Sequence, residues 1–532
     1  MNIINFIKKQ DLFIVINSLV FGILLTFAIP IDVPDFLAIP VLNVLFYLVV
    51  IVLLSVLICY LSVLLLQIKT GKKNTIRSNV FPVALIYCFP CLFIFSLYLA
   101  AFYPGIMSMD SITQWKQLIS FSFNDFHPVF HTLLNWLITR VWLSPAAISV
   151  FQILLFSFIV AYGMVSIERL GVSRRFLICV ALFYSLHPLN GIYSVTLWKD
   201  VPYSLFLMWL TILLFEIMYS DGIWLESVRN KLIVSFVLIF VFLLRHNGFA
   251  PFIITLIGLF CLYGKYWRHI LLISIVSLSV IVLIKWPLYE RLNVHRAVGG
   301  MTTCRIHHLA AIVVSDKPIN DEDRKVLETV LPTEDWKQYY SPYTANNLVL
   351  SPRFNGTCYW KEDIRKVVFD TWLRLFMKYP HIVLKHTLLN NSLVWRIRQF
   401  PDAYTMSICL LLDPNEFGLK MTPLLPGLHE SLKKQFLDIL YNDKNMLKTF
   451  IYRPALFLYT ALFFAIIFVY KNKKIKGIIT IFPLIGNSLT LFLFTPGQDT
   501  RYLYSSFLIA PLLMLLCFAN HNSQLPALKD GA

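Results

Sequence analysis

The sequence predicts an all-α polytopic membrane protein, and three features of the chain predict it. Of its 532 residues, 58% are hydrophobic and only 14% are charged, whereas soluble domains carry about 25% charged residues. The apolar residues gather in long runs separated by short basic segments. A bilayer core of about 30 Å needs about 20 apolar residues per helix. The composition therefore excludes an ordinary soluble enzyme, a disordered chain and a coiled coil.

About twelve transmembrane helices are expected from the apolar runs between charged, Pro or Gly residues. They lie near residues 12–30, 40–68, 79–101, 145–167, 176–193, 201–219, 232–246, 249–263, 269–288, 452–470, 477–495 and 502–519. The seventh and eighth runs are short and are separated only by His246, Asn247 and Gly248. A broken or re-entrant pair is therefore an alternative at that position.

This division predicts three parts. The first is a transmembrane bundle over residues 1–288, with an outer loop at 102–144. The second is an extracytoplasmic segment over 289–451, which mixes acidic turns, aromatic residues and helix-like stretches and is expected to be mostly helical. Its one convincing apolar run, Met406 to Leu412, is too short to span a membrane. The third part is a set of C-terminal transmembrane helices over 452–532.

The basic residues indicate the orientation of the chain. Lys and Arg outnumber Asp and Glu by 46 to 29, and such residues favour loops on the cytoplasmic side, near anionic lipid. Every second loop is basic: Lys8 and Lys9; Lys69, Lys72, Lys73 and Arg77; Arg169, Arg174 and Arg175; Arg229 and Lys231; Lys265 and Arg268; Lys471, Lys473, Lys474 and Lys476. The loop between the first two spans carries Asp32 and Asp35 without Lys or Arg, as expected outside. Both termini are then cytoplasmic, no nucleic-acid partner is indicated, and no cleavable signal peptide is expected.

The nine cysteines are dispersed, and the one C-x-x-C pair, Cys88 and Cys91, lies in an apolar run, where a Cys is most often a small packed hydrophobe rather than a metal ligand. Cys304 and Cys358 lie in the outer segment, where an oxidising exterior would permit a disulfide between them. Cys409 is a competing partner for either thiol.

Asp110 is the first candidate for chemistry. It follows Tyr103-Pro104-Gly105 at the end of the third span and precedes a stretch, 111–122, with the apolar spacing of an interfacial helix. A carboxylate at such a boundary lies in reduced dielectric, which suits a general base with a raised pKa. The alternative is that Asp110 only caps the interfacial helix.

His127 and His131 follow in the same loop, after Asp125 and Phe126. Because they are four residues apart, both would lie on one face of a helix. That spacing can bind zinc, but no third ligand is nearby, so hydrogen bonds to a phosphate or sugar are the favoured role. A purely structural role for His131 is also open.

Lys199 and Asp200 close the loop before the sixth span, on the side where the positive-inside rule disfavours Lys. A Lys ammonium is a natural partner for phosphate oxygens. The alternative is an ion pair between Lys199 and Asp200 or another carboxylate.

Two arginines complete the set. Arg245, His246 and Asn247 stand at the junction of two spans, and Asp499 and Arg501 precede the last span. An Arg in an apolar segment is costly unless it is paired, so it indicates a site. Snorkelling of either arginine to lipid headgroups is the alternative.

Taken together, these carboxylates, imidazoles and cations fall on one face of the protein. They predict a cavity that receives an anionic lipid headgroup, in which cations stabilise a departing phosphate and a carboxylate takes a proton from an attacking hydroxyl.

On these residues the chain resembles the GT-C class of polytopic glycosyltransferases, which use a polyprenyl-phosphate sugar donor at the outer face of the membrane. The likeness rests on Asp110, on Asp125-x-His127-Pro128 and on Asp499-Thr500-Arg501-Tyr502. Leu197-Trp198-Lys199-Asp200 and Arg245-His246-Asn247-Gly248 look like motifs of a bacterial family associated with this class. The resemblance covers roughly residues 80–290 and 450–520, and the size and layout are similar to those of O-antigen-modifying glucosyltransferases of the cell envelope.

The resemblance implies a GT-C-like fold in the bacterial inner membrane and a hexosyltransferase that inverts the anomeric carbon. Its acceptor would be a glycan or a lipid-linked glycan. Asp110 would be the catalytic base, and the substrate-binding residues would be His127, His131, Lys199, Asp200, Arg245, His246, Asn247, Asp499 and Arg501. Many members of the class carry paired acidic residues in the first loop, whereas Met109 precedes Asp110 here. No obligatory metal is therefore expected.

Two other functions compete with this one. A lipid or glycan transporter, or flippase, would carry ionisable residues near the membrane midplane, whereas the predicted spans hold few such groups and Glu216 and Lys285 lie close to span ends. A structural or assembly protein would use its outer segment to bind a partner.

Overall fold

The protein is described by a computed structural model over residues 11–29, 40–68, 80–296, 299–403, 405–442 and 446–519. In these ranges the regular elements are helices, and β pairing is limited to isolated bridges. Among the described residues, seven helices are long and apolar enough to cross a membrane, or eight if one bent pair counts as a span. The prediction of a helical, multi-pass membrane protein is confirmed.

All twelve predicted apolar segments contain helix. The bundle comprises α2 (Leu12–Ala28), α3 (Pro40–Gln67), α4 (Val80–Ala101), α7 (Pro145–Glu168), α8 (Arg174–Leu186), α9 (Pro188–Ser194), α10 (Asp200–Tyr219), α11 (Val228–Leu244), α12 (Phe249–Leu262), α13 (Trp267–Leu283), α25 (Pro454–Asn472), α26 (Phe482–Leu493) and α27 (Tyr504–Leu516). The chain bends by 60° between α8 and α9, where Pro188 cannot donate a helical hydrogen bond.

Seven or eight spans are fewer than the twelve expected, because several of the segments are short helices. α2 and α11 have 17 residues, α12 has 14 and α27 has 13. At the start of α12 and of α27 the chain forms tighter turns, η3 (His246–Gly248) and η7 (Thr500–Leu503). These turns carry polar residues that the sequence analysis assigned to a site. Helices α12 and α27 are therefore shorter than the predicted spans at the ends that carry these residues.

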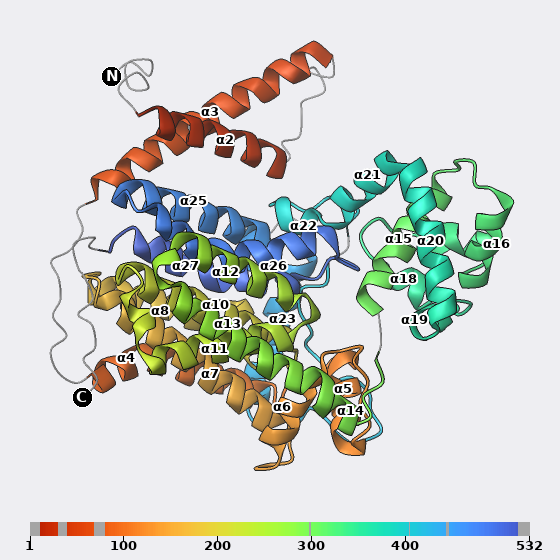
Figure 1. Cartoon of the computed structure of the whole chain (residues 1–532), viewed down its shortest axis with the longest axis horizontal. Coiled ribbons are helices and arrows are strands. Elements are labelled where there is room, and N and C mark those ends of the chain that lie inside the picture. Colours follow the sequence, from red (N-terminus) through yellow and green to blue (C-terminus); the bar gives the residue numbers. More distant parts are fainter. Residues whose placement is uncertain are drawn as a thin grey trace.

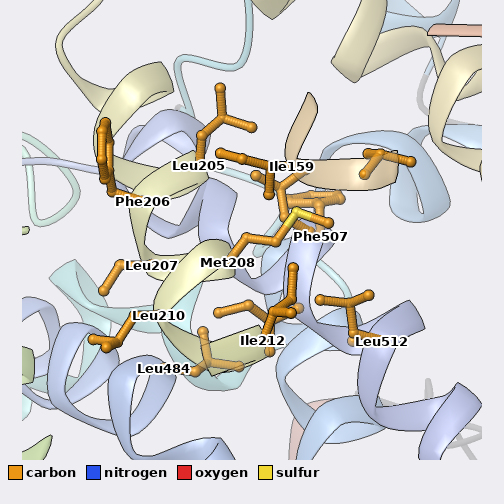
Figure 2. Packing of buried hydrophobic residues seen from close by; sticks show 14 of the residues in the cluster. Ile159, Leu205, Phe206, Leu207, Met208, Leu210, Ile212, Leu484, Phe507 and Leu512 are labelled. Atoms are coloured by element: carbon orange, nitrogen blue, oxygen red, sulfur yellow. The ribbon is translucent and has the colours of Figure 1, made fainter. Parts of the chain in front are cut away.

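Helix α10 is the centre of the bundle. All of its residues except Trp209 are buried, and it packs against α7, α11 and α27. Figure 2 shows Leu205, Met208 and Ile212 of α10 among apolar side chains of its neighbours, including Ile159 of α7 and Phe507 of α27. A helix enclosed on all sides is expected to be apolar all round, and the acidic side chains of α10 lie near its two ends, at Asp200 and Glu216.

The outer lobe, residues 299–390, has a hydrophobic core of its own and lies beside the bundle in Figure 1. Its core includes Ile306, Trp336, Leu348 and Val383. Its helices are α15 (Gly299–Val314), α16 (Asp321–Val330), α17 (Thr333–Tyr339), α18 (Asn346–Val349), α19 (Thr357–Trp360), α20 (Glu362–Lys378) and α21 (Pro380–Asn390).

The rest of the predicted outer segment returns to the bundle, so 289–451 is not one unit. Leu393 of α22 (Ser392–Trp395), Phe436 of α23 (Pro426–Tyr441) and Ile451 of α24 (Met446–Tyr452) join the main core. Between α22 and α23 a strap, residues 405–425, crosses one end of the bundle. Its apolar run pairs with other loops, because Met406 bridges Asp499 and Leu412 bridges Met107.

The disulfide considered between Cys304 and Cys358 is absent, and Cys409 is free as well. Cys304 and Cys358 are buried thiols on α15 and α19. The Cys358 thiol donates to the backbone oxygen of Asn355 at 3.5 Å. The outer lobe is therefore held by apolar packing rather than by a covalent bond between these residues.

The two ends of the bundle differ in charge. At the Tyr219 end of α10, Arg174 pairs with Glu168 at 2.8 Å and Lys476 pairs with Asp221 at 2.7 Å. A helix of this length places Asp200 about 30 Å from that end. The basic loops that the structure describes thus gather opposite Asp200. Lys8, Lys9, Lys69, Lys72, Lys73, Arg77, Asp32, Asp35 and both termini lie outside the described residues.

This polarity predicts a labelling pattern. In a background without the native cysteines, Gln338→Cys in the outer lobe should react with a membrane-impermeant maleimide on intact cells, because its side chain is exposed on the Asp200 side. Glu226→Cys, exposed at the Tyr219 end in η2 (Ile223–Glu226), should react only after permeabilisation. Labelling of position 226 alone on intact cells would invert the topology.

Candidate functional site

Loops at the Asp200 end of α10 come together to form the site. The backbone of Ile106, after α4, bonds to Val195 and Leu197, before α10, at 2.8 and 3.0 Å. Gly105 permits this approach, since it adopts φ +130° and a Cβ there would meet the Ser149 Oγ at 2.7 Å. The start of α5 (Met109–Ser120) is thereby fixed against the start of α10.

Asp110 lies in the first turn of α5, and its side chain does not cap that helix. The N-cap position is taken by Ser108. The Asp110 carboxylate is 33% exposed and faces three basic groups: the Arg501 guanidinium at 3.0 Å, the His127 imidazole at 3.7 Å and the Lys199 ammonium at 4.0 Å. Capping alone therefore does not account for Asp110.

The expectation of a raised pKa at Asp110 is wrong. Burial raises the pKa of this carboxyl, but the charges of Arg501 and Lys199 outweigh burial and bring the pKa well below its usual range. In this state Asp110 is a carboxylate held by cations.

Lys199 and His127 form the edge of the site next to Asp110. The Lys199 Nζ donates to the Nδ1 of His127 at 3.2 Å, so the proton of the neutral ring is on Nε2, which faces Asp110. Burial lowers the pKa of His127 to about 3, and Lys199 adds to that effect. Burial also lowers the pKa of Lys199, while Asp200 and Asp110 oppose it.

His127 and His131 do not share a helical face. Helix α6 (Val129–Thr139) begins after His127, with Pro128 at its N-cap position. His131 is 1% exposed, and its Nδ1 lies 3.2 Å from the Gln114 Oε1 of α5. His131 therefore joins α5 to α6, which is the structural alternative. Among the described residues, no group of three His, Cys, Asp or Glu side chains is placed to hold a metal ion.

Asp200 and Arg245 form the deepest ion pair. Asp200 is fully buried, and its carboxylate lies 2.8 Å from the Arg245 guanidinium. Arg245 lies between the rings of Tyr203 and Tyr502, at 5.5 and 4.8 Å from their centroids. It is 9% exposed, so it does not snorkel.

The two residues that follow Arg245 point elsewhere. The exposed His246 contacts the backbone oxygen of Asp125 at 3.0 Å. Asn247 donates to the Asn487 Oδ1 on α26 at 3.1 Å. Neither side chain reaches the ion pairs, although both were assigned to the site from the sequence.

Arg501 joins the remaining groups. Its Nε lies 2.8 Å from Asp499 and 3.8 Å from Asp200, while its other arm reaches Asp110. The guanidinium also stacks over Trp198 at 4.5 Å. Burial raises the pKa of the Asp499 carboxyl to about 6, against the lowering effect of Arg501.

We call the six residues with alternating charge the charge cluster. Its three carboxylates balance its three cations, and four separate stretches of the chain supply it. The members are Asp110, Lys199, Asp200, Arg245, Asp499 and Arg501. Arg501 bridges three of them, and His127 adjoins the cluster at Asp110.

Two contributing residues were named from the sequence but were given no role in the site. Trp198 lies under Arg501 and donates to the Ser108 Oγ at 2.7 Å. Lys285 lies 3.7 Å from the Asp125 carboxylate, beside the site. The lone charge of Lys285 near a span end was a usable signal for a site, and so was the place of Trp198 in the Leu197-Trp198-Lys199-Asp200 motif.

Comparison with protein families finds one match, over residues 123–392, to a family of unknown function (DUF6020). The matched range covers a little more than half of the chain and includes His127, Lys199, Asp200 and Arg245, but not Asp110, Asp499 or Arg501. No curated protein and no solved structure matches the chain.

Removing one partner of the deepest ion pair should destabilise the fold. Arg245→Gln leaves the buried Asp200 carboxylate with Arg501 at 3.8 Å as its nearest paired cation, at an expected cost of about 3 kcal/mol in the free energy of unfolding. Unfolding in mixed micelles of increasing SDS content would measure it. Asp200→Asn in the same chain should recover most of the loss. Lys116→Gln, which breaks an exposed pair with Glu416, should cost less than about 1 kcal/mol. Equal effects at positions 245 and 116 would contradict the burial argument.

Proposed function

The chain belongs to the DUF6020 family, whose function is unknown, and we propose that it is a membrane glycosyltransferase. It would move a sugar, most simply a hexose, from a polyprenyl-phosphate donor to a glycan or lipid-linked acceptor. The observation that carries this proposal is the charge cluster. A carboxylate that is one third exposed stands within 4.0 Å of two cations at one end of an apolar bundle.

The cluster suits an anionic headgroup that enters from the membrane. Arg501 and Lys199 are the cations nearest to the exposed carboxylate, with side chains 9% and 13% exposed. In such a dry environment a charge-assisted hydrogen bond to a phosphate oxygen is stronger than in water. A lipid carrier would keep its chain beside the apolar helices while its phosphate meets these groups.

Asp110 would act as the general base of an inverting displacement. It accepts the proton of the acceptor hydroxyl, the hydroxyl oxygen bonds to the anomeric carbon, and the bond from that carbon to the phosphate oxygen breaks. The electron pair leaves with the polyprenyl phosphate, whose charge Lys199 and Arg501 stabilise. No obligatory metal is part of this proposal.

The low basicity of Asp110 in the free protein fits this sequence of events. A phosphate that draws on Arg501 and Lys199 weakens their hold on Asp110 and raises its affinity for a proton. The base is then active only when the donor is bound, which limits unproductive chemistry with water.

The same proposal includes the finer architecture. We place the chain in the bacterial inner membrane, with twelve membrane-crossing or membrane-embedded segments in a GT-C-like arrangement, the charge cluster outside and both termini in the cytoplasm. The gathering of the described basic loops at the Tyr219 end supports this orientation. The charge cluster at one end of α10 favours a transferase over a transporter, which would need ionisable groups near mid-membrane.

Asp110→Asn should abolish sugar transfer. The amide keeps the shape of the side chain but cannot take the proton, so the rate of transfer from a synthetic polyprenyl-phosphate hexose should fall by about 10³-fold or more. Glu416→Gln, which changes an exposed acid on the strap at the same end, should transfer at the wild-type rate. If the Asp110→Asn variant is expressed normally, elutes normally in size-exclusion chromatography and transfers sugar at the wild-type rate, Asp110 is excluded as the base.

The rate of transfer should fall as the pH drops through about 6. Below that value Asp499 takes up a proton, because its pKa is raised to about 6, and Arg501 is then held more tightly by Asp110. Asp499→Asn should give the low rate at every pH and lose the step. A pH-rate profile that keeps its step in Asp499→Asn would assign the titration to another group.

A further inference from the structure

The outer lobe meets the charge cluster through the loop that precedes Asp499. Thr344 pairs with Gly497 in an antiparallel bridge, and the Ala345 amide donates to the Pro496 oxygen at 2.8 Å. A Cβ at position 497 would lie 2.8 Å from the Thr344 Oγ1, so only Gly permits this approach. From α21, the side-chain amide of Asn390 donates to the backbone oxygen of Thr495 at 2.6 Å.

Gln498 is the centre of this contact. It is 3% exposed, and its side-chain amide donates to the Leu389 oxygen at 3.1 Å and to the Ser392 Oγ at 2.8 Å. Its side-chain oxygen accepts from the Thr405 Oγ1 at 2.9 Å. The backbone N–H of Gln498 donates to the backbone oxygen of Tyr343, and the backbone oxygen of Gln498 accepts from the N–H of Met406, both at 3.0 Å. One residue thus ties the outer lobe, α22 and the strap together.

The chain leads from Gln498 to Asp499, and polar contacts lead from Asp499 through Arg501 to Asp110. The next residue, Asp499, accepts from the Arg501 amide at 3.1 Å and pairs with the Arg501 Nε at 2.8 Å. The other arm of Arg501 lies 3.0 Å from Asp110. The backbone that carries Asp499 and Arg501 is therefore fixed by bonds to the outer lobe on one side, and its side chains reach Asp110 on the other.

We propose that Gln498 is a positioning residue, which transmits the placement of the outer lobe to Asp499 and Arg501 and so sets the separation of Arg501 from Asp110. Its role in sugar transfer rests on the proposed function, whereas its role in ordering this loop does not. An apolar side chain of similar volume could fill the same space, but it could not form hydrogen bonds to three different segments of the chain.

Hydrogen–deuterium exchange in detergent micelles tests the ordering directly. Gln498→Leu keeps the volume and removes the three side-chain hydrogen bonds, so amides 499–503 should exchange at least about tenfold faster. Ser392→Ala removes one partner and should speed the same amides by at least about threefold. Asn391→Ala is the matched control, because Asn391 is equally buried and its side chain donates to Phe492 on α26 instead. It should leave amides 499–503 unchanged.

Unchanged exchange in both Gln498→Leu and Ser392→Ala, or an equal rise in Asn391→Ala, would overturn the proposal. If Gln498→Leu does not fold, Ser392→Ala decides the question alone.

The transfer assay supplies the second readout. In Gln498→Leu the step near pH 6 should shift or vanish, because Asp499 no longer holds Arg501 in one place, and Asn391→Ala should keep the wild-type profile. If the wild-type protein transfers no sugar while Gln498→Leu still speeds amide exchange, the glycosyltransferase proposal is refuted and the positioning role is retained. Normal transfer and an unaltered pH profile in Gln498→Leu would refute positioning and retain the glycosyltransferase.

Discussion

The guanidinium of Arg501 lies among three carboxylates that come from distant parts of the chain, at 2.8 Å from Asp499, 3.0 Å from Asp110 and 3.8 Å from Asp200. A buried charge is tolerated only when its partners and its hydrogen bonds are in place. The loops that carry these acids must therefore assemble together, and a loss at one of them leaves the others uncompensated. This constraint makes the site a single unit, although its residues are spread over about 390 positions of sequence.

The rigid part of this unit is α10. Apolar side chains of the surrounding helices enclose α10, so this helix cannot shift without disturbing the core. Asp200 therefore stays fixed at the end of α10. The rest of the unit is formed by loops that bond to each other through the backbone, among them the bridges of Met107 and Asp499 with the strap. In the proposed transferase, this fixed acid would hold the cluster together while Lys199 and Arg501 contact the phosphate of the donor.

Much of the fold could be predicted from the sequence, because long apolar runs have few alternatives in a membrane. The same reasoning predicted twelve spans, whereas seven or eight helices among the described residues are long and apolar enough to cross a membrane, because the chain near Arg245 and Asp499 forms tight turns. It also treated 289–451 as one outer unit, because hydropathy does not reveal that Phe436 packs on the bundle.

The candidate site was predictable in its residue types and less so in its detail. Charged residues beside apolar runs are costly, so Arg245 and Arg501 stood out. His131 and Asn247 were assigned to the site for their chemistry, yet the side chain of each forms a hydrogen bond to a neighbouring helix. The sign of the pKa shift at Asp110 depends on Arg501, which is 391 positions away, and local pattern carries no such information.

Mass spectrometry of the lipids and surface glycans of cells with and without this protein tests the account most directly. If the charge cluster receives a polyprenyl-phosphate sugar, cells that lack the protein should accumulate the lipid-linked sugar and lose one hexose from a surface glycan. Identical lipids and identical glycans in the two strains would contradict the account.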